Sequence, residues 1–178
     1  MVYAFEPFRE SFAKLQGNTS SDANIKVFNF GLSNQGGMRD FHSNLSSATN
    51  SLFATDEHGG PRTWGPGLLE TTELVQTEFR TIDSVFASLQ IPRIDILKLD
   101  VQGAESLVMA GAAEVCRRGL IRLIFSEIII QPTYKGQKRF DECLGSFYDS
   151  GFDLYNFYNF DRSNEGRLRQ VDAIFTRQ

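Results

Sequence analysis

The stretch Asp95-Ile-Leu-Lys-Leu-Asp-Val-Gln-Gly-Ala-Glu105 decides the fold class of this chain. It opens with a near-continuous apolar run from Ile94 to Leu99, which is typical of a strand buried on both faces of a parallel sheet. Gly103 then permits a tight turn, and apolar residues recur at helical spacing from Ala104 to Val115. A buried strand, a turn and a helix in this order indicate an α/β fold.

The rest of the chain alternates strand and helix patterns around this unit. We expect the other strands and helices at 2–5, 8–16, 24–30, 72–82, 83–89, 120–130, 138–150, 153–158 and 170–176, with Asp83 as the cap of the helix at 83–89. This order predicts a Rossmann-like, mostly parallel sheet with helices on both faces, ending in an antiparallel strand pair. Residues 33–70 are rich in Ser, Asn and Gly, and we expect a long polar insert with at most one short strand.

Length and composition fit a single domain over residues 1–178. The net charge is −4 and the pI is about 5.2, without a basic stripe, which argues against nucleic acid as a partner. No apolar run reaches the roughly 18 residues of a membrane span. There is no signal-like start, so we expect no membrane partner and a cytoplasmic protein. Cys116 and Cys143 lie far apart and only two histidines are present, so we predict free buried thiols and no structural zinc site. We assign no metal ligands, and a metal at Asp100 and Glu127 stays an open alternative.

Polar residues follow the expected strands, where ligands of α/β sheets bind. Glu6 ends the first strand, and a carboxylate there either binds the two hydroxyls of an adenosine ribose or is an exposed strand-end acid. Gly31-Leu32-Ser33 ends the second strand, either beside an adenine or as a plain loop start. Both pairs of alternatives stay open at this point.

The strongest chemical signal is the charge at the end of the 94–99 strand. Lys98 and Asp100 are two residues apart and so lie on one face, and Glu105 falls in the first turn of the next helix. We take Asp100, Glu105 and Lys98, in this order, as candidate catalytic residues. The alternative is a structural one, with Asp100 as a cap and Glu105 as a partner of the helix dipole.

Other candidates are less specific. Glu127 interrupts an apolar run, so it either faces the same cleft as Asp100 or is a paired acid near a strand end. His42 and His58 lie in the polar insert, where a general base and an exposed histidine are both possible. Trp64 and Tyr134 are candidates for a substrate pocket or for ordinary packing.

Three segments together carry a family resemblance: Val2-Tyr-Ala-Phe-Glu-Pro7, Thr81-Ile-Asp83 and the stretch from Asp95 to Glu105. They resemble the FkbM family of methyltransferases. The resemblance implies a class I methyltransferase fold, S-adenosylmethionine as the cofactor, and methylation of oxygen, often a hydroxyl of a sugar or natural product.

The resemblance also implies roles for individual residues. Glu6 would bind the ribose of S-adenosylmethionine and Gly31 to Ser33 would edge its adenine. Asp100 would lie where donor and acceptor meet. Gln102 stands where the family usually has an acid.

The given sequence departs from the family in one respect. It contains neither the family's glycine-rich turn, of the type Asp-x-Gly-Ala-Asn-x-Gly, nor the strand before that turn. That strand would lie between the strands at 2–5 and 94–99. Without it, backbone groups of two apolar strands would stay unpaired, which is costly in a buried sheet. We therefore expect an N-terminally truncated domain, or a gap closed by unusual pairing or by self-association with a second chain.

Three functions follow as hypotheses. The first is a methyltransferase acting on a small-molecule acceptor, with the proton removed by a carboxylate or histidine. The second is an inactive fragment that binds a partner. The third is an NAD-dependent oxidoreductase, against which the motif from Lys98 to Glu105 and the terminal strand pair argue.

Overall fold

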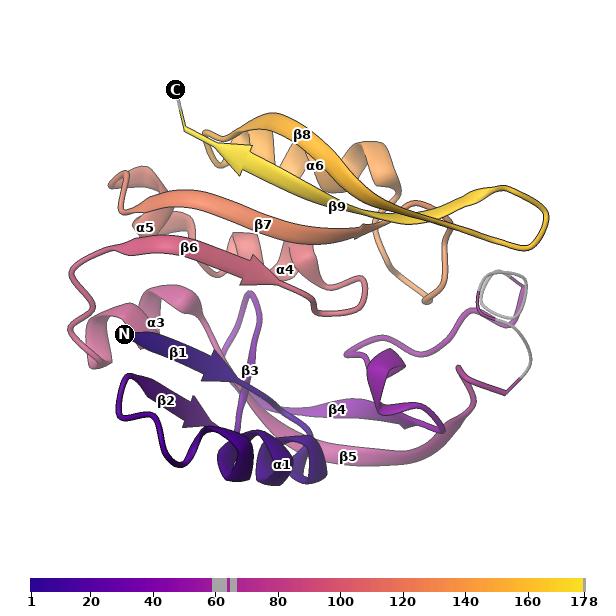
Figure 1. Ribbon diagram of the computed structural model, residues 1–178, viewed down its shortest axis with the longest axis horizontal. Helices are drawn as coiled ribbons and strands as arrows, with labels where there is room; N and C mark the ends of the chain where they lie inside the picture. The colour runs from indigo at the N-terminus through magenta and orange to yellow at the C-terminus, as the bar shows by residue number, and fades with distance from the viewer. Residues whose placement is uncertain (59–63, 65–66, 178) are drawn as a thin grey trace.

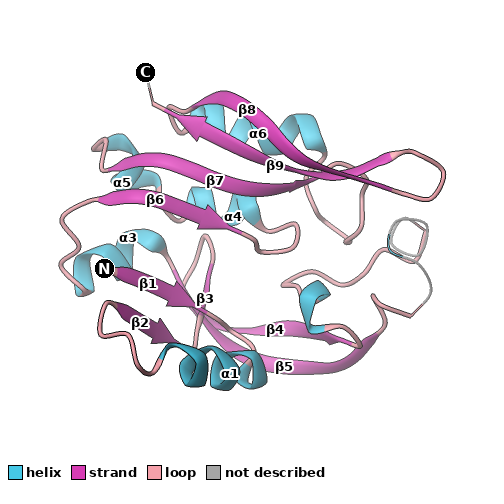
Figure 2. Ribbon diagram, in the orientation of Figure 1, coloured by secondary structure: helices cyan, strands magenta, loops and turns pink. Residues whose placement is uncertain are grey.

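The computed structural model of the protein describes residues 1–58, 64 and 67–177, and shows an α/β arrangement built on three sheets (Figures 1 and 2). The strands are β1 (Val2–Phe5), β2 (Ile25–Phe28), β3 (Gly31–Leu32), β4 (Gly37–Asn44), β5 (Thr71–Arg80), β6 (Ile94–Leu99), β7 (Ile121–Ile129), β8 (Asp153–Arg162) and β9 (Leu168–Thr176). The helices are α1 (Arg9–Thr19), η1 (Ser47–Thr49), α3 (Ile82–Ser88), α4 (Glu105–Ala110), α5 (Ala113–Arg117) and α6 (Phe140–Asp149).

The main core lies against the four-stranded sheet, whose order is β6-β7-β9-β8. β6 and β7 are parallel, whereas β9 runs antiparallel to both β7 and β8, so the predicted terminal antiparallel pair is confirmed. Helices α4, α5 and α6 lie behind this sheet in Figure 1. Val108, Ile124, Phe147 and Phe175 are fully buried there, and the rings of Phe147 and Phe175 stack at 4.2 Å. Each such side chain contributes roughly 1.5–3 kcal/mol by leaving water.

The other strands form two smaller sheets. β1 pairs with β2 in parallel, and α1 follows β1 directly. β5 pairs in parallel with β3 and antiparallel with β4. β4 is the one strand that the prediction for residues 33–70 allowed, but it is eight residues long rather than short. The pairing partner of β4 lies beyond the insert, so local sequence does not reveal it. Residues 59–63, 65 and 66 of the insert, with Pro61 and Pro66, lie outside the described residues.

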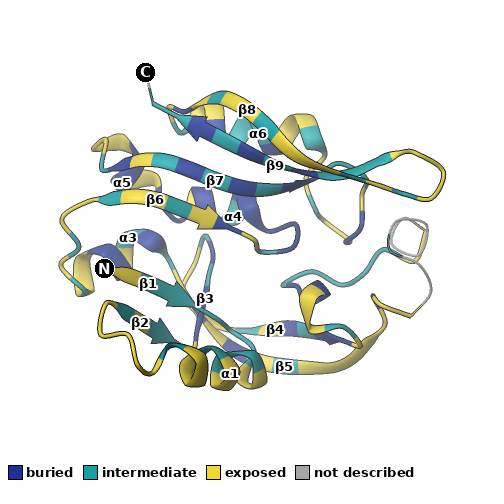
Figure 3. Ribbon diagram, viewed as in Figure 1, coloured by how far each residue is buried: buried dark blue, intermediate teal, exposed yellow. Residues whose placement is uncertain are grey.

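The predicted mostly parallel sheet with helices on both faces is not continuous, because the described strands form three separate sheets. Among the described residues β6 pairs with β7 alone and β1 with β2 alone, so both strands are sheet edges. The prediction that β6 is buried on both faces is wrong for the same reason, because Ile96 is 65% exposed. Figure 3 shows that β6 is more exposed than the neighbouring β7. Figure 1 shows β1 and β6 running in the same direction.

Two local predictions also need correction. The single helix expected from Ala104 to Val115 is two short helices, α4 and α5, which break at Gly111. A Cβ at Gly111 would come 2.1 Å from the Ser33 carbonyl oxygen, so the chain passes too close there for a side chain. Asp83 does not cap its own helix, since Thr81 does so. The Asp83 carboxylate instead accepts hydrogen bonds from the backbone N–H groups of Glu114 and Val115, at the start of α5.

Candidate functional site

A cleft of about 750 Å³ runs between the edges of β1 and β6. Consecutive residues from Val2 to Pro7 line one wall, which shows that the cleft follows the edge of β1 rather than one of its faces. Lys98 to Gln102 and Glu127 line the other wall. The carboxyl ends of β1 and β6 therefore open into the same space, as expected for a ligand site of an α/β protein.

Four polar side chains, those of Lys98, Asp100, Gln102 and Glu127, form a hydrogen-bonded cluster on the β6 side of the cleft. Gln102 Nε2 donates to Glu127 Oε2 over 2.9 Å and to Asp100 Oδ1 over 3.2 Å. Lys98 Nζ lies 3.1 Å from Asp100 Oδ2, so the ammonium group pairs with Asp100. The predicted proximity of Lys98 and Asp100 is confirmed, and Glu127 faces the same cleft as Asp100.

Gln102 is the bridging member of this cluster, a role that the sequence did not predict. Its backbone is left-handed, with φ of 50°, and is followed by Gly103 at φ 91°. Ser51 Oγ donates to the Gln102 carbonyl oxygen over 2.7 Å. The Tyr134 hydroxyl lies 3.0 Å from both Gln102 Oε1 and the Thr49 carbonyl oxygen, and its one hydrogen can go to either. Tyr134 is thus a buried support of the cluster and does not line the cleft.

Glu127 combines burial with like-charge neighbours. Gln170 Nε2 donates to Glu127 Oε1 over 2.7 Å, so both carboxylate oxygens accept from an amide. Desolvation is the largest influence on this group and raises its pKa, and the charge of Asp100 raises it further, to about 7. The hydrogen bond from Gln102 opposes the shift but does not outweigh burial.

Glu105 lies behind the cluster rather than on the cleft. Its side chain is in the core, the residue is 2% exposed, and Oε1 accepts from the Gly103 backbone N–H over 3.1 Å. Burial raises the pKa of Glu105 to about 7, against the lowering effect of its backbone hydrogen bonds. This location suits a group that holds the 101–105 turn.

The residues expected to bind the cofactor are only partly brought together. Glu6, Gly31 and Leu32 line the cleft, whereas Ser33 is fully buried outside it, where Arg39 Nη1 donates to Ser33 Oγ over 2.7 Å. Glu6 Oε1 accepts from the Phe8 backbone N–H over 2.8 Å, and burial raises the pKa of Glu6. The ring in contact with Gly31 is that of Phe79, which a Cβ at Gly31 would approach to 2.2 Å.

Three polar side-chain atoms of the cleft residues are buried and have no hydrogen-bond partner among the described residues: Asn50 Nδ2, Trp64 Nε1 and Gln170 Oε1. Leaving such groups unpaired costs about 1–3 kcal/mol each, so they are suited to a polar ligand. The Arg169 guanidinium lies over the Trp64 ring at 5.0 Å. Trp64 therefore contributes to the cleft, and the sequence had left this open.

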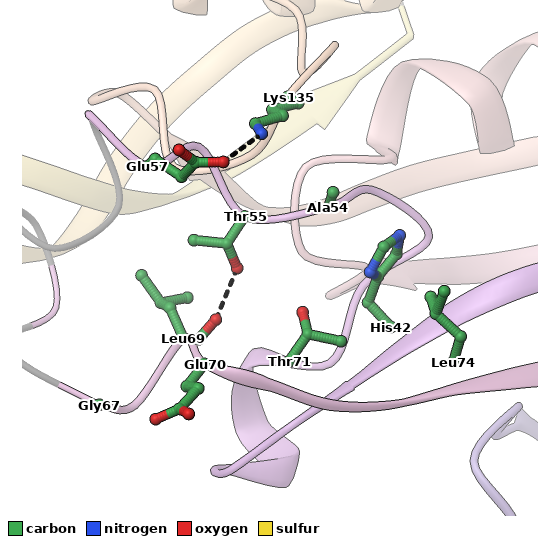
Figure 4. A pocket seen from close by; sticks show the side chains of 10 residues that line it. All are labelled: His42, Ala54, Thr55, Glu57, Gly67, Leu69, Glu70, Thr71, Leu74 and Lys135. Carbon is green, nitrogen blue, oxygen red and sulfur yellow. Dashed lines mark hydrogen bonds and ion pairs between the residues drawn. The ribbon is translucent and has the colours of Figure 1, made fainter.

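Neither histidine lies on this cleft. His42 faces a separate, shallower cavity of about 520 Å³, whose rim includes the ion pair between Lys135 and Glu57 (Figure 4). Desolvation lowers the pKa of His42, opposed by Asp40. His58 is exposed, and its backbone N–H donates to Asp56 Oδ1. A carboxylate is therefore the better-placed candidate for proton removal in the cleft.

Among residues 1–58, 64 and 67–177, no group of three or more His, Cys, Asp or Glu side chains is arranged to hold a metal ion. No helix in this part of the chain is long and apolar enough to cross a membrane. Cys116 and Cys143 are buried free thiols, as predicted, and burial raises their pKa values to about 11 and about 12.

The model of the methyltransferase FkbM domain matches residues 1–154, which is most of the chain. The chain belongs to the FkbM methyltransferase family. It is also 26% identical over 147 residues to the 2-O-methyltransferase NoeI of Sinorhizobium fredii, a match that covers 76% of this chain. The chain spans 56% of the length of that relative. No solved structure matches the chain.

Proposed function

We propose that this FkbM domain is the catalytic domain, or part of it, of an S-adenosylmethionine-dependent methyltransferase. The enzyme would methylate a hydroxyl of a sugar or small natural product. The observation that carries the proposal is the single cleft into which β1 delivers Glu6 and β6 delivers Lys98, Asp100 and Gln102. Family membership supports methyl transfer, and the similarity to a 2-O-methyltransferase favours oxygen as the acceptor atom.

The donor end of the cleft would be the Glu6 end. The Glu6 carboxylate has one oxygen engaged by Phe8, and its other oxygen suits the hydroxyls of a ribose. Gly31 and Leu32, together with Phe41 and Phe79, give an apolar wall that suits the adenine. Ser33 would support this wall from behind, since it is buried outside the cleft.

The acceptor end would be the end around Asp100 and Glu127. Asp100 would orient the acceptor or hold the cofactor, and Lys98 would fix the Asp100 carboxylate through their ion pair. Glu105 would act on the reaction only indirectly, by holding the turn that carries Gln102 and Gly103. Catalysis would then depend mainly on positioning the donor and the acceptor.

The unpartnered atoms of Asn50, Trp64 and Gln170 support a hydroxyl-rich acceptor. A sugar offers several hydroxyls, each of which can donate and accept, so its chemistry suits both the donor atoms and the acceptor atom. An aromatic side chain beside such atoms also suits the apolar face of a sugar ring. A purely apolar acceptor would leave the three atoms unpaired.

Calorimetric titration of the protein with S-adenosylhomocysteine and with NAD tests this function. We expect S-adenosylhomocysteine to bind and NAD to give no heat, and Glu6→Ala to weaken the binding at least tenfold. A Glu10→Ala variant, altered on the exposed face of α1, is the matched control. Binding of NAD alone would refute the methyltransferase proposal.

The open edges of β1 and β6 favour a second candidate, a binding module that takes up an extended segment. The backbone N–H groups of Val2 and Glu6 point to β2, and that of Ile94 points towards β7. Because backbone N–H groups point to alternate sides along a strand, those of Tyr3 and Phe5 in β1 and of Leu97 in β6 point towards the cleft. A second copy of the chain is the proposed occupant. Sedimentation velocity over a range of concentrations tests it, and a concentration-independent monomer would refute it.

A further inference from the structure

We propose that Glu127 accepts the proton of the acceptor hydroxyl, so that the hydroxyl to be methylated binds at the Glu127 end of the cleft. The inference rests on the proposed methyltransferase function and assigns its acceptor subsite. It differs from the expectation based on sequence, which placed Asp100, Glu105 and Lys98 at the reacting centre.

Glu127 is held in one orientation by two amides that come from different elements. Gln102, in the turn after β6, donates to Oε2 over 2.9 Å, and Gln170, on β9, donates to Oε1 over 2.7 Å. Amide donors fix a carboxylate without neutralising its charge. Each oxygen keeps a further lone pair that can accept a proton from a ligand in the cleft.

The neighbouring carboxylates are less suited to this step. Asp100 lies 3.1 Å from the Lys98 ammonium, so one of its carboxylate oxygens is already engaged by an ion pair. Glu105 is buried outside the cleft lining, against the backbone of its own turn. Glu127 lines the cleft and is hydrogen-bonded to amides rather than to an ammonium or guanidinium group.

Burial and the surrounding charges together favour a proton-accepting role for Glu127 near neutral pH. Desolvation is the largest cause of its raised pKa, Asp100 beside the end of β6 and Asp172 on β9 raise the pKa further, and Lys98 opposes them. Glu105 on α4 and Tyr134 are the other titratable groups coupled to it. A general base works best when its pKa lies near the working pH, and a pKa of about 7 meets this condition.

Gln102 can hold Asp100 and Glu127 together because its side chain is an amide that donates to both carboxylates. An acid at this position would place a third carboxylate beside Asp100 and Glu127 and would remove the donor that both of them share. The Oε1 atom of the Gln170 amide that holds Glu127 is buried at the cleft and has no hydrogen-bond partner in the described part of the chain. An acceptor hydroxyl that contacts Gln170 Oε1 would therefore also lie close to the Glu127 carboxylate.

The step balances as a methyl transfer. With S-adenosylmethionine bound, a C–O bond to the acceptor would form as the S–C bond of the sulfonium breaks, and the electron pair of that bond would stay on sulfur. The acceptor oxygen loses its proton to Glu127, which then releases it to solvent. Gln102 and Gln170 hold the carboxylate throughout, because each can donate to it in both protonation states.

The test compares Glu127→Gln with Asp95→Asn, an exposed acid on the neighbouring β6 that pairs with Arg93 outside the cleft. Three properties are measured for each protein: binding of S-adenosylhomocysteine by calorimetry, methylation of a panel of methyl hexosides from pH 5.5 to 9, and the titration of the Glu127 carboxyl by ¹³C NMR of the free protein. The NMR readout is independent of activity.

We expect wild type and Asp95→Asn to show kcat rising with pH to a plateau, with an apparent pKa near that of Glu127. Glu127→Gln should bind S-adenosylhomocysteine normally and lose roughly 10²–10⁴-fold in kcat together with this rise. An active Glu127→Gln variant with an unchanged pH profile would overturn the assignment, as would a Glu127 carboxyl that titrates below pH 5. Failure of wild type to bind S-adenosylhomocysteine or to methylate any hexoside would instead overturn the proposed function and the assignment with it.

Discussion

The hydroxyl of Tyr134 lies 3.0 Å from Oε1 of Gln102, a residue 32 positions earlier in the chain. Through this contact a side chain of the core orients an amide whose Nε2 group bonds to both Asp100 and Glu127 on the wall of the cleft. The orientation of the polar side chains in the cleft therefore depends on how the core packs behind them.

Tyr134→Phe removes the hydroxyl and leaves Gln102 Oε1 and the Thr49 carbonyl oxygen without this donor. We expect the free energy of unfolding to fall by about 1–3 kcal/mol, because a buried acceptor loses its partner. Turnover should fall several-fold, as the amide is no longer fixed. Urea denaturation and initial rates measure both effects. Tyr148→Phe, on the exposed side of α6, is the control, and an equal loss there would contradict the prediction.

Asp100→Ala is expected to abolish methyl transfer. The substitution removes the carboxylate that we propose orients the reacting groups, and it leaves Lys98 without its ion-pair partner. The fall should be at least 100-fold, measured as transfer of a labelled methyl group from S-adenosylmethionine. Near-normal turnover would show that the active centre lies elsewhere.

The buried Glu105 predicts a stability that depends on pH. Its pKa is about 7 in the folded protein and near 4.5 in the unfolded chain, so between these values the folded state binds the extra proton. Stability is then greatest below about pH 4.5 for this group and is lost as pH rises, by about 1.4 kcal/mol per pH unit, up to about pH 7. Glu105→Gln should abolish this component. Denaturation curves of both proteins at pH 5, 6, 7 and 8 measure it, and parallel stability profiles would refute it.

Gly111→Ala tests the close contact between the α4–α5 break and the strand-end residue Ser33. The added Cβ would meet the Ser33 carbonyl oxygen at 2.1 Å, and we expect a loss of at least about 2 kcal/mol because backbone must move. Gly145→Ala is the matched control, since it lies in α6 with no atom within 4 Å of the added Cβ. That variant should gain about 0.5–1 kcal/mol. A neutral Gly111→Ala variant would show that the contact is not tight.

A pair of proline variants tests strand addition at the open edge of β1. Tyr3→Pro removes an N–H that faces the cleft, so it should block uptake of a further strand and leave the β1–β2 pairing intact. Ala4→Pro removes an N–H that faces β2 and should destabilise that pair instead. Sedimentation velocity and circular dichroism separate these outcomes. Unchanged self-association in Tyr3→Pro would exclude this edge as the docking surface.

Local sequence determined the α/β class, most strands and helices, and the position of Glu6 and Asp100 at strand ends. These features depend on the two-residue period of strands, on glycine turns and on the family motif, all of which are local. The motif also identified the family correctly, and the family model confirms it.

Only the tertiary structure decided which side chains meet. Pairing between residues distant in the chain brings Gln102 to Ser51, Glu127 to Gln170, and Tyr134 to Thr49, across 51, 43 and 85 positions. It also buried Glu105 away from the cleft and left β1 and β6 as edges. No periodicity encodes such contacts, because they depend on how sheets and loops pack together. Sequence therefore located the acidic end of the cleft, and packing selected Glu127 as the carboxylate best placed to accept a proton.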